Sequence, residues 1–201
     1  MKRRALIASI GGLAIAWPLA CYAQEPKQPL KRVGVLAANV PCPLQPDTIG
    51  VRRLAELGWI EGQTMVFECV SAVGRLDQVP VLARELVSRR PDVLMAVRSD
   101  FLITLKQETM TIPIVMINGW EPVRLGLITS FAQPGGNVTG VAWFGLEFKQ
   151  LELLKQIVPN LKRVAIIRGV GGDAVTARFP EMGKVFKEDL QSTASVLGLT
   201  W

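Results

Sequence analysis

The sequence contains no histidine among its 201 residues. It therefore lacks the side chain that most often serves as a general base and as a metal ligand. Cysteine is scarce as well: Cys21, Cys42 and Cys69 form neither a CxxC pair nor the spacing of a zinc site. Catalysis would have to use carboxylates, lysine or a cysteine without a histidine partner. We expect a binding or structural protein that holds no metal and no cofactor.

A concentration of charge of one sign is also missing. The formal net charge is +6, but three of the basic residues are Lys2, Arg3 and Arg4 at the N-terminus. The other basic residues are scattered among acidic ones, whereas nucleic-acid-binding proteins carry basic patches. We therefore expect no nucleic-acid partner. Hydrophobic residues at 49% and charged residues at 20% are typical of a globular protein.

Residues 1–23 have the three parts of a secretory signal peptide. Basic residues at positions 2–4 precede an apolar stretch, and small residues allow cleavage after Ala23. The apolar stretch is shorter than the roughly 20 residues that cross a bilayer, and Pro18 weakens it as a helix. The sequence predicts export to the periplasm. A retained membrane anchor and a lipid attached at Cys21 are the alternatives.

Export bears on two further features that the sequence leaves open. In an oxidising compartment Cys42 and Cys69 either form a disulfide or remain two small buried residues. Arg3 and Arg4 fit a twin-arginine signal, but paired arginines are also common in ordinary charged N-terminal regions.

Apolar runs alternate with amphipathic stretches after a polar leader at residues 24–30. The runs predict strands at residues 31–37, 64–70, 92–97, 112–117, 138–143 and 164–167. Helical spacing predicts helices at residues 48–57, 76–89, 102–108, 123–131, 146–158 and 179–197. Residues 169–173 (GVGGD) lack the spacing of a phosphate-binding loop, so we expect a flexible turn there. The alternation is typical of an α/β fold with a doubly wound parallel sheet.

Several stretches of the chain resemble one protein family. They are residues 16–20 (AWPLA), 57–63 (LGWIEGQ), 77–90 (DQVPVLARELVSRR), 111–115 (TIPIV), 134–140 (PGGNVTG) and 150–159 (QLELLKQIVP). In this order they are similar to ABC-transporter substrate-binding proteins related to tryptophan and tyrosine binders. The resemblance implies a periplasmic-binding fold of type I, in which two α/β lobes joined by hinge strands clamp a small molecule.

The same resemblance implies a division of the chain. Residues 31–140 match the first lobe, residues 141–145 run into the hinge, and residues 146–201 match only part of the second lobe. Family members continue past this point, so the resemblance implies a C-terminally truncated member. The implied partners are a small-molecule solute and the membrane permease of an ABC transporter, and the oligomeric state stays open.

Ligands of doubly wound sheets bind beyond the carboxyl ends of the strands. The side chains expected there are Asn39 after the first strand, Arg98, Ser99 and Asp100 after the third, and Asn118, Trp120 and Glu121 after the fourth. Their chemistry fits an amino acid: serine, asparagine or arginine donors for a carboxylate, acidic residues for an ammonium group, and tryptophan for a ring. The alternative is a set of solvated loop tips. Relatives have smaller residues at positions 98–101 and GDP at positions 120–122, so the solute stays open.

Three functions are consistent with these features. The first is the solute-binding component of an importer, which closes two lobes on a small organic solute without chemistry. The second is a truncated fragment of such a protein that binds nothing. The third is an exported α/β enzyme that uses Asp100 or Glu121, for which the sequence offers no histidine and no nucleophile motif.

Overall fold

The structure is a computed structural model that describes residues 29–37, 42, 44–45, 48–143, 146–166 and 171–201. The predicted signal peptide with its cleavage position Ala23, the candidate Asn39, and residues 144–145 of the predicted hinge lie outside the described residues. Residues 31–201 form one unit.

Five parallel strands form one sheet. They are β1 (Lys31–Ala37), β2 (Met65–Ser71), β3 (Val93–Ala96), β4 (Ile114–Trp120) and β5 (Val138–Trp143). Their order is β2-β1-β3-β4-β5, and all four pairings are parallel. The order changes direction between β1 and β3, which is the doubly wound arrangement. The predicted α/β fold class is confirmed.

Helices lie between and after the strands. They are α2 (Ile49–Glu56), α3 (Val79–Ser88) with the preceding 3-10 turn η1 (Leu76–Gln78), α4 (Ser99–Glu108), α5 (Leu146–Ile157), α6 (Gly171–Arg178) and α7 (Pro180–Leu197). Within the described part of the chain, no helix is both long enough and apolar enough to cross a bilayer. The structure begins α4 three residues before the predicted helix, so Ser99 and Asp100 are helical and do not lie in a loop.

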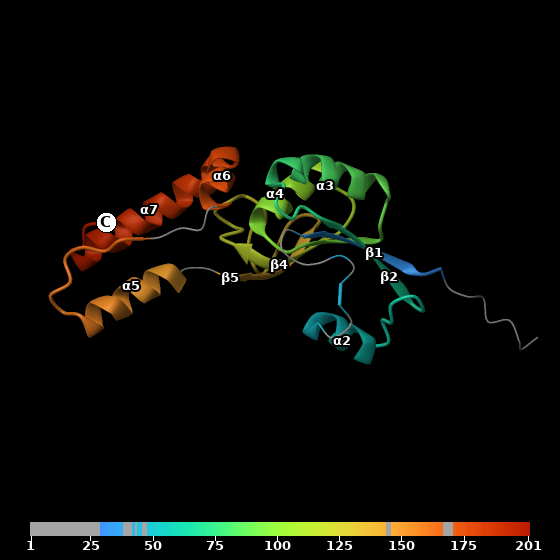
Figure 1. The fold of residues 1–201 in the computed structure, drawn as a ribbon, viewed down its shortest axis with the longest axis horizontal. Coiled ribbons are helices and arrows are strands. Elements are labelled where there is room, and N and C mark those ends of the chain that lie inside the picture. The colour runs from blue at the N-terminus through green and yellow to red at the C-terminus, as the bar shows by residue number, and fades with distance from the viewer. Residues whose placement is uncertain (1–28, 38–41, 43, 46–47, 144–145, 167–170) are drawn as a thin grey trace, which may run out of the picture. The chain divides into compact units, whose positions relative to one another are not determined.

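The main core lies on the face of the sheet that α3 and α4 cover (Figure 1). Leu36 of β1 and Ile114 of β4 meet Leu86 of α3 and Phe101 of α4 there, and all four are fully buried. Successive strand residues point to opposite faces, so Val35 belongs to a smaller core on the other face. This second core also receives Leu54 of α2 and Leu44, which precedes that helix.

Three local predictions are wrong. Residues 123–131, predicted as a helix, form turns, and Gly126 there has a φ of +65° that a helix does not allow. The described residues 164–166 of the predicted strand at 164–167 form no strand, and one parallel bridge joins the preceding Arg163 to Thr200. Residues 171–173, predicted as part of a flexible turn, begin α6.

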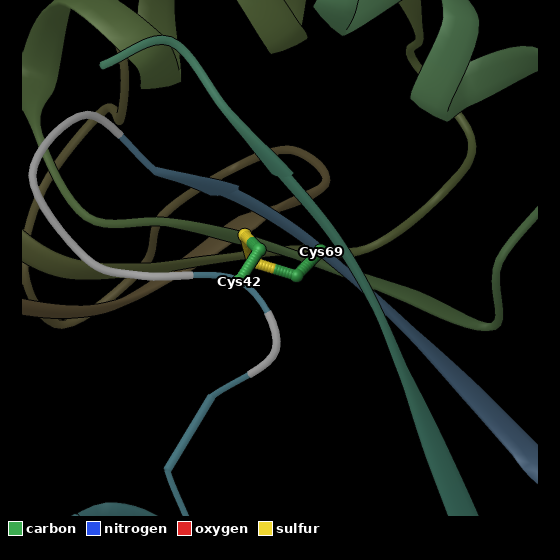
Figure 2. The surroundings of a disulfide bond; sticks show 2 residues. All are labelled: Cys42 and Cys69. Carbon is green, nitrogen blue, oxygen red and sulfur yellow. A yellow bond between two sulfur atoms is a disulfide. The ribbon is translucent and has the colours of Figure 1, made fainter.

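A disulfide joins Cys42 to Cys69 of β2, with the two Cα atoms 5.6 Å apart (Figure 2). The sequence left open whether these cysteines form a disulfide or stay unpaired, and in the structure they form the disulfide. Because β2 is an edge strand, the disulfide attaches Cys42, which follows β1, to the edge strand of the sheet.

The stretch at residues 134–140 (PGGNVTG) holds β5 against the rest of the sheet. The side-chain amide of Asn137 donates hydrogen bonds to the carbonyl oxygens of Ile112 (2.8 Å) and Thr109 (3.2 Å). Gly140 pairs with Met116 of β4 and has a φ of +132°. A Cβ atom at position 140 would lie 2.0 Å from the Met116 carbonyl oxygen, so only glycine fits there.

Candidate functional site

The candidate site lies where the carboxyl ends of β3 and β4 meet the start of α4. These two strands are neighbours in the sheet, and β3 also borders β1 at the point where the strand order changes direction. Open α/β sheets bind their ligands at this kind of point. The structure therefore places the candidates after β3 and β4 at one edge.

Arg98 and Asp100 bind each other at this edge. The guanidinium donates two hydrogen bonds to the carboxylate, from Nε to Oδ1 at 2.9 Å and from Nη2 to Oδ2 at 3.0 Å. It also lies 5.4 Å from the centre of the Phe101 ring. Asp100 is only 4% exposed and stands in the first turn of α4, where the helix dipole favours negative charge. Each of these predicted ligand groups thus already neutralises the other.

Ser99 and Trp120 connect α4 to the end of β4. The Trp120 backbone N–H donates to Ser99 Oγ at 2.7 Å, and Ser99 Oγ donates to the Trp120 carbonyl oxygen at 3.3 Å. Both residues are buried. The Ser99 hydroxyl therefore pairs with backbone groups and fixes the position of the tryptophan.

The Trp120 indole is at the same edge. Its ring lies 6.4 Å from the Phe186 ring of α7, measured between centroids, at an interplanar angle of 51°. Its Nε1 atom is buried and has no hydrogen-bond partner among the described residues. Buried indole N–H groups normally have an acceptor, so this one is an exception.

Glu121 and Asn118 have different surroundings. Glu121 has a φ of +45° and lies near Arg124, whose guanidinium contacts both Glu188 and Asp189 of α7. The hydrogen bond to Asp189 raises the pKa of Arg124, and the charges of Asp189, Glu121 and Glu188 act in the same direction. Asn118 is exposed in β4, and in the described part of the chain no hydrogen bond joins its side chain to the other candidates.

A pocket of about 460 Å³ adjoins Asp100. One wall is formed by Leu76, Asp77 and Val79 around the start of α3, and the other by Val175, Arg178 and Phe179 around the junction of α6 and α7. Its size and its mainly apolar walls are typical of a site for a small ligand. In the described part of the chain, no group of three or more acidic or cysteine side chains is arranged to hold a metal ion.

Two charged residues of this pocket are absent from the sequence-based candidates. Arg178 Nη1 donates to the carbonyl oxygens of Leu76 (3.1 Å) and Asp77 (3.5 Å), and the Arg178 guanidinium lies 5.5 Å from the Phe179 ring centre. Arg178 and Asp77 are 101 positions apart in the sequence. Because α6 was not predicted, no sequence pattern indicated that these residues meet.

Comparison with known proteins points to one family. The model of the family described as ABC transporter substrate binding protein matches residues 49–190. A protein of Clostridioides difficile (strain R20291) named tyrosine-binding protein is 28% identical over 117 residues, which are 58% of this chain and 34% of that protein.

Two solved structures are similar in fold. One is a conserved domain protein from Vibrio cholerae, with a TM-score of 0.68 and 27% identity. The other is the ABC domain in complex with L-Trp from Streptococcus pneumoniae, with a TM-score of 0.67 and 26% identity. Each match covers 86% of this chain and 56% of the other. The chain thus spans about a third of the curated relative and little more than half of each solved chain.

Proposed function

Because this chain belongs to the family of ABC transporter substrate-binding proteins, we propose that it is the extracytoplasmic solute-binding component of an importer. In this role it binds an amino acid in the pocket between the starts of α3 and α4 and the junction of α6 and α7, and presents it, unchanged, to a membrane permease. The names of two similar proteins, one a tyrosine-binding protein and one solved with L-Trp, support an aromatic amino acid as the solute.

The observation that carries this proposal is the pocket beside Asp100. Two of its walls come from the segments that follow β2 and β3, on the carboxyl side of the sheet where ligands of this fold class bind, and it has the size of a small-molecule site. An apolar pocket with a few polar groups suits an aromatic amino acid better than a highly charged solute.

The domain organisation is part of the same proposal. Residues 31–140 would form the first lobe, residues 141–145 the hinge, and residues 146–201 part of the second lobe. Contacts between Arg124 and α7 support a close approach of the two parts. Cleavage after Ala23 and export to the periplasm complete the proposal, with the solute reaching the site outside the cytoplasm.

Binding without chemistry is favoured over catalysis. The buried carboxylate nearest the pocket, that of Asp100, is occupied by two hydrogen bonds from Arg98. The sequence has no histidine to act as a base. An enzyme that used Asp100 would first have to break a two-bond ion pair, whereas a binding protein benefits from such a rigid wall.

Ligand-induced stabilisation tests the proposal. The purified chain is melted with each of the twenty L-amino acids, and the same samples are followed by calorimetry. A solute at 100 to 1,000 times its Kd should raise the free energy of unfolding by about 3–4 kcal/mol. Absence of any shift would support the alternative of a fragment that binds nothing. Chemical conversion of a bound solute, lost on Asp100→Asn, would support the enzyme instead.

A further inference from the structure

Two charges of opposite sign line the pocket without an ion-pair partner. Among the described residues, no salt bridge includes Asp77 or Arg178, whereas Asp100 is paired with Arg98. Arg178 uses Nη1 for two backbone carbonyl oxygens, and the hydrogen bonds of the described residues leave its Nε and Nη2 donors free. The pocket therefore offers one carboxylate and one guanidinium.

The walls between these charges are apolar. Val79 is 3% exposed and Val175 is 9% exposed, and Leu76 and Phe179 are partly buried beside them. A molecule that fills the pocket would displace water from around both charged groups, and charge interactions strengthen as water is excluded. A zwitterion with an apolar side chain complements such a pocket in both charge and polarity.

We propose that Asp77 binds the ammonium group and Arg178 the carboxylate of an α-amino acid with an apolar side chain. This inference rests on the proposed function and names the groups that recognise the solute. The sequence alone suggested Arg98 and Asp100 for these roles, but the two residues satisfy each other. In the new assignment their ion pair forms a neutral part of the pocket wall.

The assignment has a mechanical consequence. Asp77 belongs to η1 beside the sheet, and Arg178 is the last residue of α6 in the C-terminal part of the chain. A zwitterion bound by both residues would connect these two parts at the point where Arg178 already meets the Leu76 carbonyl oxygen. Binding should therefore slow amide hydrogen exchange in α6 and at the start of α7.

The test compares three probes that differ in one charged group each. L-Tryptophan carries both groups, tryptamine lacks the carboxylate, and 3-(indol-3-yl)propionate lacks the ammonium group. The full chain should bind L-tryptophan best. Asp77→Asn and Arg178→Gln should each weaken L-tryptophan binding by about 10- to 100-fold, the range for a lost charge-assisted hydrogen bond. L-Tyrosine with tyramine and 3-(4-hydroxyphenyl)propionate forms a second set.

The pattern of selectivity identifies the two roles. Asp77→Asn should abolish the preference for L-tryptophan over 3-(indol-3-yl)propionate, which lacks the ammonium group. Arg178→Gln should abolish the preference for L-tryptophan over tryptamine, which lacks the carboxylate. Glu85→Gln on α3 and Arg163→Gln are matched charge-removing controls, and both should bind as the unmodified chain does. Asp77 and Arg178 are exposed, so melting temperatures should verify that the variants fold.

The outcomes separate this inference from the proposed function. If the unmodified chain binds an L-amino acid and both variants bind it equally well, the assignment of Asp77 and Arg178 is wrong and the proposed function stands. If the unmodified chain binds none of the twenty L-amino acids, the proposed function fails and the inference fails with it.

Discussion

The part of the molecule at residues 31–143 and the part at residues 146–201 differ in how their apolar residues are buried. In the first, five hydrogen-bonded strands share a continuous core with α3 and α4. In the second, α7 packs on α5 and α6, and strand pairing among the described residues is limited to the Arg163–Thr200 bridge. Neither of the two hydrophobic cores described above includes a residue of this second part.

The difference shows that an apolar run becomes a strand only where neighbours are present. Residues 31–37 and 164–167 both read as buried parallel strands. β1 is paired along its whole length with β2 and in part with β3, whereas among the described residues the backbone N–H of Val164 donates a single hydrogen bond, to Thr200. Parallel strands need covered faces and paired edges, so the second run stays irregular.

The largest loss of stability should come from Gly140→Val, which disrupts the pairing of β5 in the part at residues 31–143. The new side chain would collide with the Met116 carbonyl oxygen, and valine does not adopt the positive φ at this position. Strain and overpacking together should lower the free energy of unfolding by about 4 kcal/mol. Urea unfolding followed by circular dichroism measures this loss.

Gly136→Ala is the matched control in the same stretch. A Cβ atom there meets nothing within 4 Å, so its unfolding midpoint should stay near that of the unmodified chain. If Gly140→Val unfolds at the same urea concentration as Gly136→Ala, β5 is not held at Gly140, and the contrast between the two parts loses its main support.

Reduction of the disulfide should have the next largest effect. Cys42 and Cys69 are separated by 27 positions, and a cross-link of that span stabilises by about 3.5 kcal/mol through the entropy of the unfolded chain. Cys42→Ser with Cys69→Ser should reproduce the loss seen on adding a reductant. A reductant should then have no further effect on the double variant. Equal stability with and without the disulfide would contradict the prediction.

The sequence predicted the sheet well because its strands are short apolar runs with charged or glycine-rich ends. It failed where long-range contacts decide the structure. Ser99 was expected in a loop, but its hydroxyl bonds to the Trp120 backbone, 21 positions away, and α4 begins there. Residues 123–131 are apolar enough for a helix, yet Gly126 takes a left-handed conformation and the segment turns.

The sequence predicted where the candidate site lies but not which of its residues contact one another. The rule about carboxyl ends located Arg98, Asp100 and Trp120 at one edge, and the structure places them together there. It did not indicate that Arg98 and Asp100 bind each other. Nor did it indicate Asp77 and Arg178, because their approach depends on α6 lying against the start of α3.

A smaller and more local effect is expected from Leu190→Ala. Leu190 in α7 is 3% exposed, and removal of a buried leucine side chain usually costs about 2–3 kcal/mol at a site that relaxes in part. The loss should be confined to residues 146–201 if the two parts unfold separately. Amide hydrogen exchange should then speed up in α5 and α7 while β1 and β3 stay protected.

Val196→Ala is the control for this experiment, because Val196 is on the same helix and 84% exposed. It should leave exchange in both parts unchanged. Faster exchange in β1 and β3 on Leu190→Ala would contradict the expectation and show that the two parts unfold as one unit.

The smallest effect concerns Asp92, just before β3. Its carboxylate accepts hydrogen bonds from the Arg32 backbone N–H (2.8 Å) and from Lys31 Nζ (3.1 Å), and these bonds, the backbone one first, lower its pKa below 3.8. Because its pKa is lower in the folded state, the carboxylate stabilises the protein at pH values above its unfolded-state pKa of about 4. This stabilisation is lost as the pH falls through the folded-state pKa. Asp92→Asn should therefore be less stable than the unmodified chain at pH 6, and urea midpoints should converge as pH falls below 4. A stability gap for Asp92→Asn that stays constant between pH 6 and pH 3 would mean that the carboxylate does not stabilise the start of β3 through its charge.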